Sequence, residues 1–193
     1  MLPDLETPRL ALRPRRPADL DDCLAMDLDP SVARFIWGAP PDPEKHREAL
    51  RGRFAGGWPK LGGIWVVEER AAPGFLGWSG LFPLEKTGLI EIGYRYLPKA
   101  WGRGLATEAA ACVLDQGFRA FAFDPIVAVS HPDNRASHRV LQKIGLARQA
   151  DAVHYRQTLA VFRLSRADYL ASGKNLGDGP AQAATPSDPP RTP

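Results

Sequence analysis

The feature that most constrains this chain is a strand, a short glycine-containing connection and a long helix that follow one another directly. Residues Leu89–Leu97 are mostly aliphatic and aromatic and stop at Pro98, as expected of a strand that ends where a backbone N–H is lacking. Residues Leu105–Phe121 repeat small and apolar residues at helical spacing. The sequence therefore predicts a tight strand-to-helix junction at residues 98–104.

Two glycines, Gly102 and Gly104, stand immediately before the predicted helix. Because glycine has no side chain, the backbone there can approach a ligand closely, and the first N–H groups of the helix have no partner within it. Together with the positive end of the helix dipole, these donors favour a polyanion such as a pyrophosphate. A pair of glycines before a helix is equally typical of a plain turn, so the neighbouring residues decide between the two interpretations.

Those neighbours resemble the acetyl-CoA loop of the GCN5-related N-acetyltransferases. Residues 99–109 read Lys-Ala-Trp-Gly-Arg-Gly-Leu-Ala-Thr-Glu-Ala and follow a strand that carries a carboxylate, Glu91. The resemblance is closest to the branch that contains the ribosomal-protein alanine N-terminal acetyltransferases. Loops of this family usually begin with Gln or Arg; Lys99 keeps the charge of Arg without its planar fork.

Other segments resemble the same branch in the same order. Residues 6–20 look like its opening strand and first helix, and residues 29–35 are similar to the next connection. Downstream, the run from Asn134 to Ser137 is similar to the family's Asn-x-x-Ser entry to its fourth helix. Only the final strands, within residues 147–166, match poorly in detail.

The resemblance implies an α/β fold with a mixed, mostly antiparallel central sheet flanked by helices. It also implies that acetyl-CoA is the co-substrate. The cofactor-binding residues expected from it are Tyr96, Leu97, Lys99, Gly102, Arg103, Gly104, Leu105, Ala106, Asn134 and Ser137.

The order of elements supports this fold without the resemblance. Strands are predicted at Arg9–Arg13, Ile64–Glu68, Phe75–Phe82, Leu89–Leu97 and Ile126–Ser130, with a hairpin near Val153–Leu164, and helices at Pro17–Leu28, Pro43–Phe54, Leu105–Phe121 and Asn134–Ile144. Such a mixture predicts one sheet with helices on its faces. Residues 1–171 are expected to form this domain, with Tyr169 and Leu170 packing back on it. The Gly-, Pro- and Ala-rich residues 172–193 are expected to be disordered.

Glu91 is the candidate general base. With the two-residue alternation of a strand it shares a face with Gly93 and Arg95, and a carboxylate acting through water can deprotonate an amine. The competing interpretation is that Glu91 only pairs with Arg95, and the residues leave both open.

Asn134 and Ser137 also have two interpretations. An asparagine before a helix is a good N-cap whatever the ligand, whereas the resemblance implies that Asn134 reaches the pantetheine or phosphate part of CoA. The resemblance places Ser137 near the thiolate as a candidate general acid, with Tyr155 as another candidate. The thioester oxygen is expected to accept a backbone N–H from Gly93–Leu97.

Charge and composition limit the classes of partner that we expect this chain to bind. The formal net charge is +3, and the densest basic cluster is Arg9, Arg13, Arg15 and Arg16, which is interpreted as a solvated face rather than a nucleic-acid arm. No apolar run approaches about 18 residues and no secretory signal is evident, so we expect a cytoplasmic protein that does not bind membranes. No metal is expected, since the histidines and Cys23 and Cys112 are scattered.

The leading hypothesis is acetyl transfer from acetyl-CoA to a primary amine, with a peptide or protein N-terminal α-amine favoured. An α-amine has a pKa of about 7.7–8.0 and is partly neutral at pH 7, unlike a lysine side chain at about 10.4. The alternatives are a small amine, such as an amino acid, polyamine or antibiotic, or a CoA-binding regulatory module without turnover. A monomer or homodimer is expected. The sequence does not identify the acceptor, because the large apolar residues that could bind it suit a core as well as a pocket: Phe35, Ile36, Trp37, Trp58 and Trp78.

Overall fold

The computed structural model describes residues 2–55 and 62–173, so Trp58 and the predicted tail from residue 174 onward lie outside the described residues. The strands run in the order β1-β2-β3-β4-β5-β6-β9-β7, with β8 pairing beside β9. Their bounds are β1 (Leu5–Glu6), β2 (Leu10–Pro14), β3 (Gly63–Glu69), β4 (Phe75–Pro83), β5 (Ile90–Tyr96), β6 (Ile126–Ser130), β7 (Ala147–Arg148), β8 (Ala152–His154) and β9 (Gln157–Leu164).

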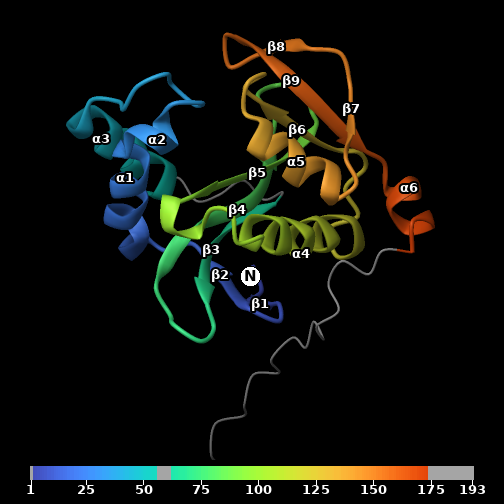
Figure 1. Ribbon diagram of the computed structural model, residues 1–193, viewed down its shortest axis with the longest axis horizontal. Helices are drawn as coiled ribbons and strands as arrows, with labels where there is room; N and C mark the ends of the chain where they lie inside the picture. The colour runs from blue at the N-terminus through green and yellow to red at the C-terminus, as the bar shows by residue number, and fades with distance from the viewer. Residues whose placement is uncertain (1, 56–61, 174–193) are drawn as a thin grey trace, which may run out of the picture.

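The helices accompany this sheet in two groups (Figure 1). Their bounds are α1 (Leu20–Leu28), α2 (Pro30–Ala33), α3 (Pro43–Ala55), α4 (Leu105–Arg119), α5 (Arg135–Lys143) and α6 (Arg166–Ala171), with short 3-10 turns η1 (Pro17–Asp19) and η2 (Pro98–Ala100). Helices α1, α2 and α3 lie together, apart from α4 and α5. The mixed, mostly antiparallel sheet with flanking helices confirms the predicted fold class.

The two faces of β5 pack into different cores because its side chains alternate. Ile90 and Ile92 point into the larger core, which they share with apolar residues of α4 such as Leu114. On the opposite face, the smaller core joins Val66 of β3 to residues of α1, α2 and α3. Glu91 lies between the two isoleucines in sequence, and therefore on the α1–α3 face.

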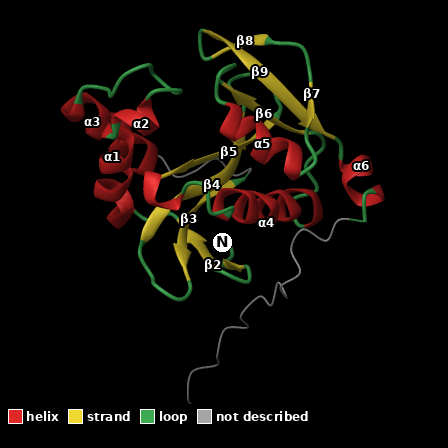
Figure 2. Cartoon of the chain, viewed as in Figure 1, coloured by secondary structure: helices red, strands yellow, loops and turns green. Residues whose placement is uncertain are grey.

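The parallel contact between β5 and β6 divides the sheet into two parts (Figure 2). It is the only parallel pairing within the described strands, and it covers just two residue pairs, Ile90 with Ile126 and Glu91 with Val127. Beyond Glu91 the two strands separate, while β4 continues to pair with β5 as far as Tyr96. The sheet therefore opens next to Glu91.

The predicted long elements are present, whereas β1, β7 and α2 were not predicted. Strands β1 and β7 have two residues each, and α2 has four, so none carries a periodic pattern long enough to detect. At the end of the domain Tyr169 is buried and stacks on Phe118 with ring centroids 4.8 Å apart, as predicted. Leu170 remains 43% exposed, so its predicted packing was wrong. In the described part of the chain, no helix is long and apolar enough to cross a bilayer.

Candidate active site

The connection between β5 and α4 has the conformation that its glycines predict. Gly102 and Gly104 have φ angles of 72° and 77°, in the left-handed region that favours glycine, and Gly104 is the N-cap of α4. A Cβ at Gly102 would meet nothing within 4 Å. The glycines are therefore required by the backbone path and not by crowding, and the loop presents open backbone to a ligand.

Side chains from the start of the chain hold the first turn of α4 in place. Glu108 accepts hydrogen bonds from Thr7 Oγ1 at 2.6 Å and from Arg9 Nε at 2.6 Å. Arg9 Nη1 also donates to the carbonyl oxygen of Arg103 at 3.0 Å. Arg9 belongs to the basic cluster that was interpreted as a solvated face; it is exposed, and its guanidinium also supports the glycine loop.

The predicted cofactor residues of this loop contribute in different ways. Lys99 is exposed beside the glycines, whereas the guanidinium of Arg103 is bound to the Glu69 carboxylate. Tyr96 is buried, and its hydroxyl forms a 2.7 Å hydrogen bond with Ser79 in the core. Leu97 is half-buried and donates its backbone N–H to Leu76 at 2.9 Å. Tyr96 and Leu97 thus anchor the loop.

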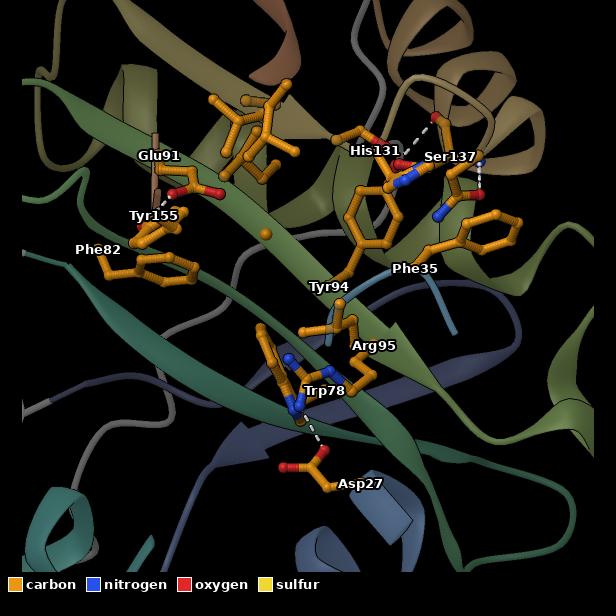
Figure 3. Close-up of a pocket in the computed structure, with 18 of the residues that line it drawn as sticks. Asp27, Phe35, Trp78, Phe82, Glu91, Tyr94, Arg95, His131, Ser137 and Tyr155 are labelled. Carbon is orange, nitrogen blue, oxygen red and sulfur yellow. Dashed lines mark hydrogen bonds and ion pairs between the residues drawn. The ribbon is translucent and has the colours of Figure 1, made fainter. Parts of the chain in front are cut away.

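A cavity of about 580 Å³ lies where β5 and β6 separate (Figure 3). Glu91, Gly93, Tyr94 and Arg95 line it from β5, and residues 128–130 line it from β6. Its remaining wall comes from β3 and β4, from the α1–α3 region, from α5 and from the β8–β9 hairpin. The cavity therefore brings both predicted catalytic residues, Glu91 and Ser137, to one space.

Glu91 is buried, with 6% of its surface exposed, and its partner is a tyrosine. The hydroxyl of Tyr155 donates to Glu91 Oε2 at 2.7 Å, the contact drawn at the upper left of Figure 3. Burial raises the pKa of the Glu91 carboxyl to about 7, although the hydrogen bond from Tyr155 opposes the rise. A carboxyl with this pKa can accept a proton near neutral pH.

Arg95 lines the same cavity but binds a different carboxylate. Its guanidinium pairs with Asp27 of α1 and lies between the rings of Trp37 and Trp78, 4.8 and 5.4 Å from their centroids. The other oxygen of Asp27 is 2.7 Å from Nε2 of His46. The alternative in which Glu91 pairs with Arg95 was therefore wrong.

Tyr155 reaches Glu91 from the turn of the β8–β9 hairpin. Tyr155 and Arg156 have φ angles of 50° and 61°, an uncommon conformation for residues other than glycine. Glu85, in the connection between β4 and β5, holds the turn by accepting the Tyr155 N–H at 3.1 Å and by contacting His154 Nδ1 at 3.0 Å. No local sequence signal links residues 85, 91 and 155, so this contact could not be found from the sequence.

Asn134 and Ser137 open α5 and both line the cavity. Asn134 Oδ1 accepts the N–H of Ser137 at 3.1 Å, so the N-cap interpretation is confirmed. The Ser137 hydroxyl lies 3.1 Å from the hydroxyl of Tyr94. The N-cap hydrogen bond uses the side-chain oxygen of Asn134, whereas the side-chain nitrogen of Asn134 takes no part in it. The cap is compatible with a contact to a ligand.

Of the five residues that suited core or pocket equally, Phe35, Ile36, Trp37 and Trp78 line the cavity. This part of the cavity wall is therefore largely aromatic. Across residues 2–55 and 62–173, no group of three or more His, Cys, Asp or Glu side chains is arranged to hold a metal ion.

Several proteins of known sequence are similar to this chain. The chain is 38% identical over 98 residues to the uncharacterized protein YkkB of Bacillus subtilis, covering 50% of this chain and about half, 53%, of YkkB. It is 32% identical over 151 residues to the uncharacterized N-acetyltransferase YoaA of the same organism, covering 77% of this chain and 85% of YoaA.

Solved structures match over most of the chain. The acetyltransferase from Agrobacterium tumefaciens superposes with a TM-score of 0.74 at 24% identity, covering 85% of this chain and 95% of that one. The spermidine N-acetyltransferase from Vibrio cholerae, in complex with CoA and spermine, has a TM-score of 0.69 at 16% identity, covering 83% and 98%. At these identities the likeness shows the fold. Residues 9–147 match the acetyltransferase (GNAT) domain family, and the chain belongs to that family.

Proposed function

We propose that the protein transfers the acetyl group of acetyl-CoA to the α-amine of a peptide or protein N-terminus. The observation that carries the proposal is the buried Glu91 carboxyl, whose pKa of about 7 lies close to that of an α-amine, about 7.7–8.0. Near neutral pH such a carboxylate can remove the proton of an attacking ammonium. A lysine ammonium, with a pKa of about 10.4, is a poorer match.

The opening of the sheet supports a route for the reaction. Acetyl-CoA supplies the activated thioester, which would enter from the α4 side with its pyrophosphate on the N–H groups that follow Gly102 and Gly104. The amine would enter on the α1–α3 side and meet the thioester carbon beside Glu91. Beyond Glu91, where β6 has diverged, backbone N–H groups of β5 would donate to the thioester oxygen.

The protons balance with two side chains. Glu91 takes the first proton of the acceptor ammonium, directly or through water, and the neutral amine then bonds to the acetyl carbon. The carbon–sulfur bond breaks to leave a thiolate, and the second proton that the nitrogen loses replaces the proton that the thiolate receives. Ser137 is the candidate that protonates this thiolate, with Tyr94 as its hydrogen-bond partner. The other candidate, Tyr155, already donates to Glu91, which favours Ser137 as the acid. Asn134 would contact the pantetheine or phosphate part of the same ligand.

Two alternatives lead to different acceptors or to none. A small amine would fit the same cavity, and the FsC-acetyl coenzyme A-N(2)-transacetylase of Aspergillus fumigatus is 26% identical to this chain over 152 residues. A regulatory module that only binds CoA has no need for a buried carboxylate of raised pKa, and the Glu91–Tyr155 pair therefore favours an enzyme.

The deciding experiment measures release of the CoA thiol from acetyl-CoA with a panel of amines. We expect turnover with short peptides that carry a free N-terminus, and none with the same peptides after N-terminal blocking. Turnover only with spermidine, an aminoglycoside or free amino acids would show that the acceptor is a small amine and not a peptide. Binding of acetyl-CoA without thiol release from any amine would contradict an enzymatic role.

A further inference from the structure

The acceptor side of the cavity carries two arginines that the chemistry above does not use, Arg15 and Arg53. Arg15 follows β2 and donates its backbone N–H to Ile64 of β3 at 2.9 Å. Its guanidinium lies 4.2 Å from the centroid of the Phe54 ring in α3, next in sequence to Arg53. Burial lowers the pKa of Arg15, and the positive charge of Arg53 adds to that effect. The two cations are therefore close together at this wall.

The carboxylates that line the cavity are held by partners other than Arg15 and Arg53. Asp27 and Glu91 are the acidic residues among the described lining residues. Asp27 is bound to Arg95 and His46, with only 3% of its side chain exposed. Glu91 is bound to Tyr155, and its pKa of about 7 leaves it partly neutral at pH 7. The acceptor side is thus positive overall, which opposes a polycation and attracts an anionic group.

The sheet register gives the separation between the base and this basic wall. Arg15 lies beside Ile64, which pairs with Gly80, which pairs in turn with Gly93 of β5. Three strand spacings place the backbone of Arg15 about 14 Å from Gly93, next to Glu91 in the cavity. A span of this length corresponds to about four extended residues, so a carboxylate within the first four residues of a peptide can bridge it.

We infer that the acceptor carries a carboxylate within about four residues of its amine, and that Arg15 and Arg53 bind this carboxylate while Glu91 receives the amine. The inference rests on the proposed function and specifies its substrate class as a peptide N-terminus with an acidic side chain within its first few residues. Arginine suits this role because its fork of donors matches a carboxylate.

The test compares three C-terminally amidated tripeptides, Ala-Ala-Glu, Ala-Ala-Gln and Ala-Ala-Lys, as acceptors in the thiol-release assay. We expect kcat/KM to be about tenfold higher for the Glu peptide than for the Gln peptide, and lowest for the Lys peptide. Equal values, or a preference for Lys, would overturn the inference and leave the N-terminal acetyltransferase proposal intact. No turnover of any peptide would contradict that proposal itself.

A charge reversal with a matched control assigns the effect to the basic wall. Arg53→Glu is expected to remove the preference for the Glu peptide and favour the Lys peptide. Arg51→Glu makes the same change two residues earlier, on an exposed part of the same helix outside the cavity lining, and is expected to keep the original preference. The same shift in both variants would show only a long-range charge effect and would contradict a specific site.

The pair 6-aminohexanoate and hexylamine separates a small acid from a peptide. Both have a primary amine on a six-carbon chain, but only 6-aminohexanoate has a distant carboxylate. Turnover of 6-aminohexanoate alone, with no peptide accepted, would support a carboxylate site and contradict the peptide as its source. Equal turnover of the two small amines, with no difference among the peptides, would overturn the carboxylate site.

Discussion

The two halves of the proposed site are built in different ways. On the cofactor side, outside the lining of the cavity, a continuous segment from Tyr96 to Ala106 presents mainly backbone, and its shape depends on two glycines with positive φ. On the acceptor side, side chains converge from α1, α3, β5 and the β8–β9 hairpin, and Glu91 and Arg95 are each held by a partner distant in the sequence. A ligand bound by backbone groups is little affected when most side chains of the loop are replaced. A ligand bound by side chains can be lost or exchanged through a single substitution.

The largest effect is expected for Glu91→Gln. Loss of the proton acceptor should lower kcat by about a hundredfold at pH 7, with the affinity for acetyl-CoA unchanged. The deficit should shrink above pH 8, where more of the acceptor α-amine is already neutral. The measurement is a pH–rate profile beside calorimetric titration of acetyl-CoA, with Glu48→Gln, an exposed position on α3, as the control. Parallel profiles for the variant and the unmodified protein would assign Glu91 a structural role.

Gly104→Val tests the cofactor side. A β-branched residue cannot readily adopt the φ of 77°, so the loop should change shape and acetyl-CoA should bind about tenfold more weakly. Gly88→Val is the matched control, since Gly88 has a φ of 78° and, like Gly102, open space around it. Both variants should lose similar stability, and only Gly104→Val should lose affinity. If both variants fold and bind acetyl-CoA with equal affinity, the glycine loop does not contribute to acetyl-CoA binding.

Tyr155→Phe is expected to have a smaller effect that depends on pH. The Tyr155 hydroxyl stabilises the ionised form of Glu91, so its removal should raise the pKa of Glu91 further above 7. The acidic limb of the pH–rate profile should then shift to higher pH by about one pH unit. This shift corresponds to the free energy of about one hydrogen bond to a charged group. Tyr169→Phe loses a comparable bond, to Asp115, outside the cavity lining and should leave the profile in place. A shift to lower pH would contradict the assigned direction.

No effect is expected from truncation after Gly173. All residues assigned to either side of the cavity precede this position, and residues 174–193 contain few bulky apolar side chains. The melting temperature and the acetyl-CoA affinity should both match the full chain within error. A clear loss of either would show that these residues contact the domain.

The same contrast explains what the sequence could predict. The junction at Gly102 and Gly104 and the N-cap at Asn134 were predictable because the local backbone determines both. The alternation of β5 placed Glu91 on the correct face, but its partner came from residue 155 in a hairpin that matched the family poorly. The pairing of Arg95 with Asp27 joins residues 68 positions apart, and no periodic pattern encodes it. Arg15 belonged to a cluster interpreted as solvated, because nothing in the sequence reveals the cavity beside it.

The contact between Thr7 and Glu108 has a consequence for how the chain folds. It joins residues 101 positions apart, so the first turn of α4 gains its support only after the opening strands have met a segment synthesised much later. Contacts of this sequence separation form slowly, because a long loop must close before they contribute. During refolding, acetyl-CoA binding should therefore appear late, after the local helices, and the delay should shorten in a circular permutant that brings these two segments close in sequence.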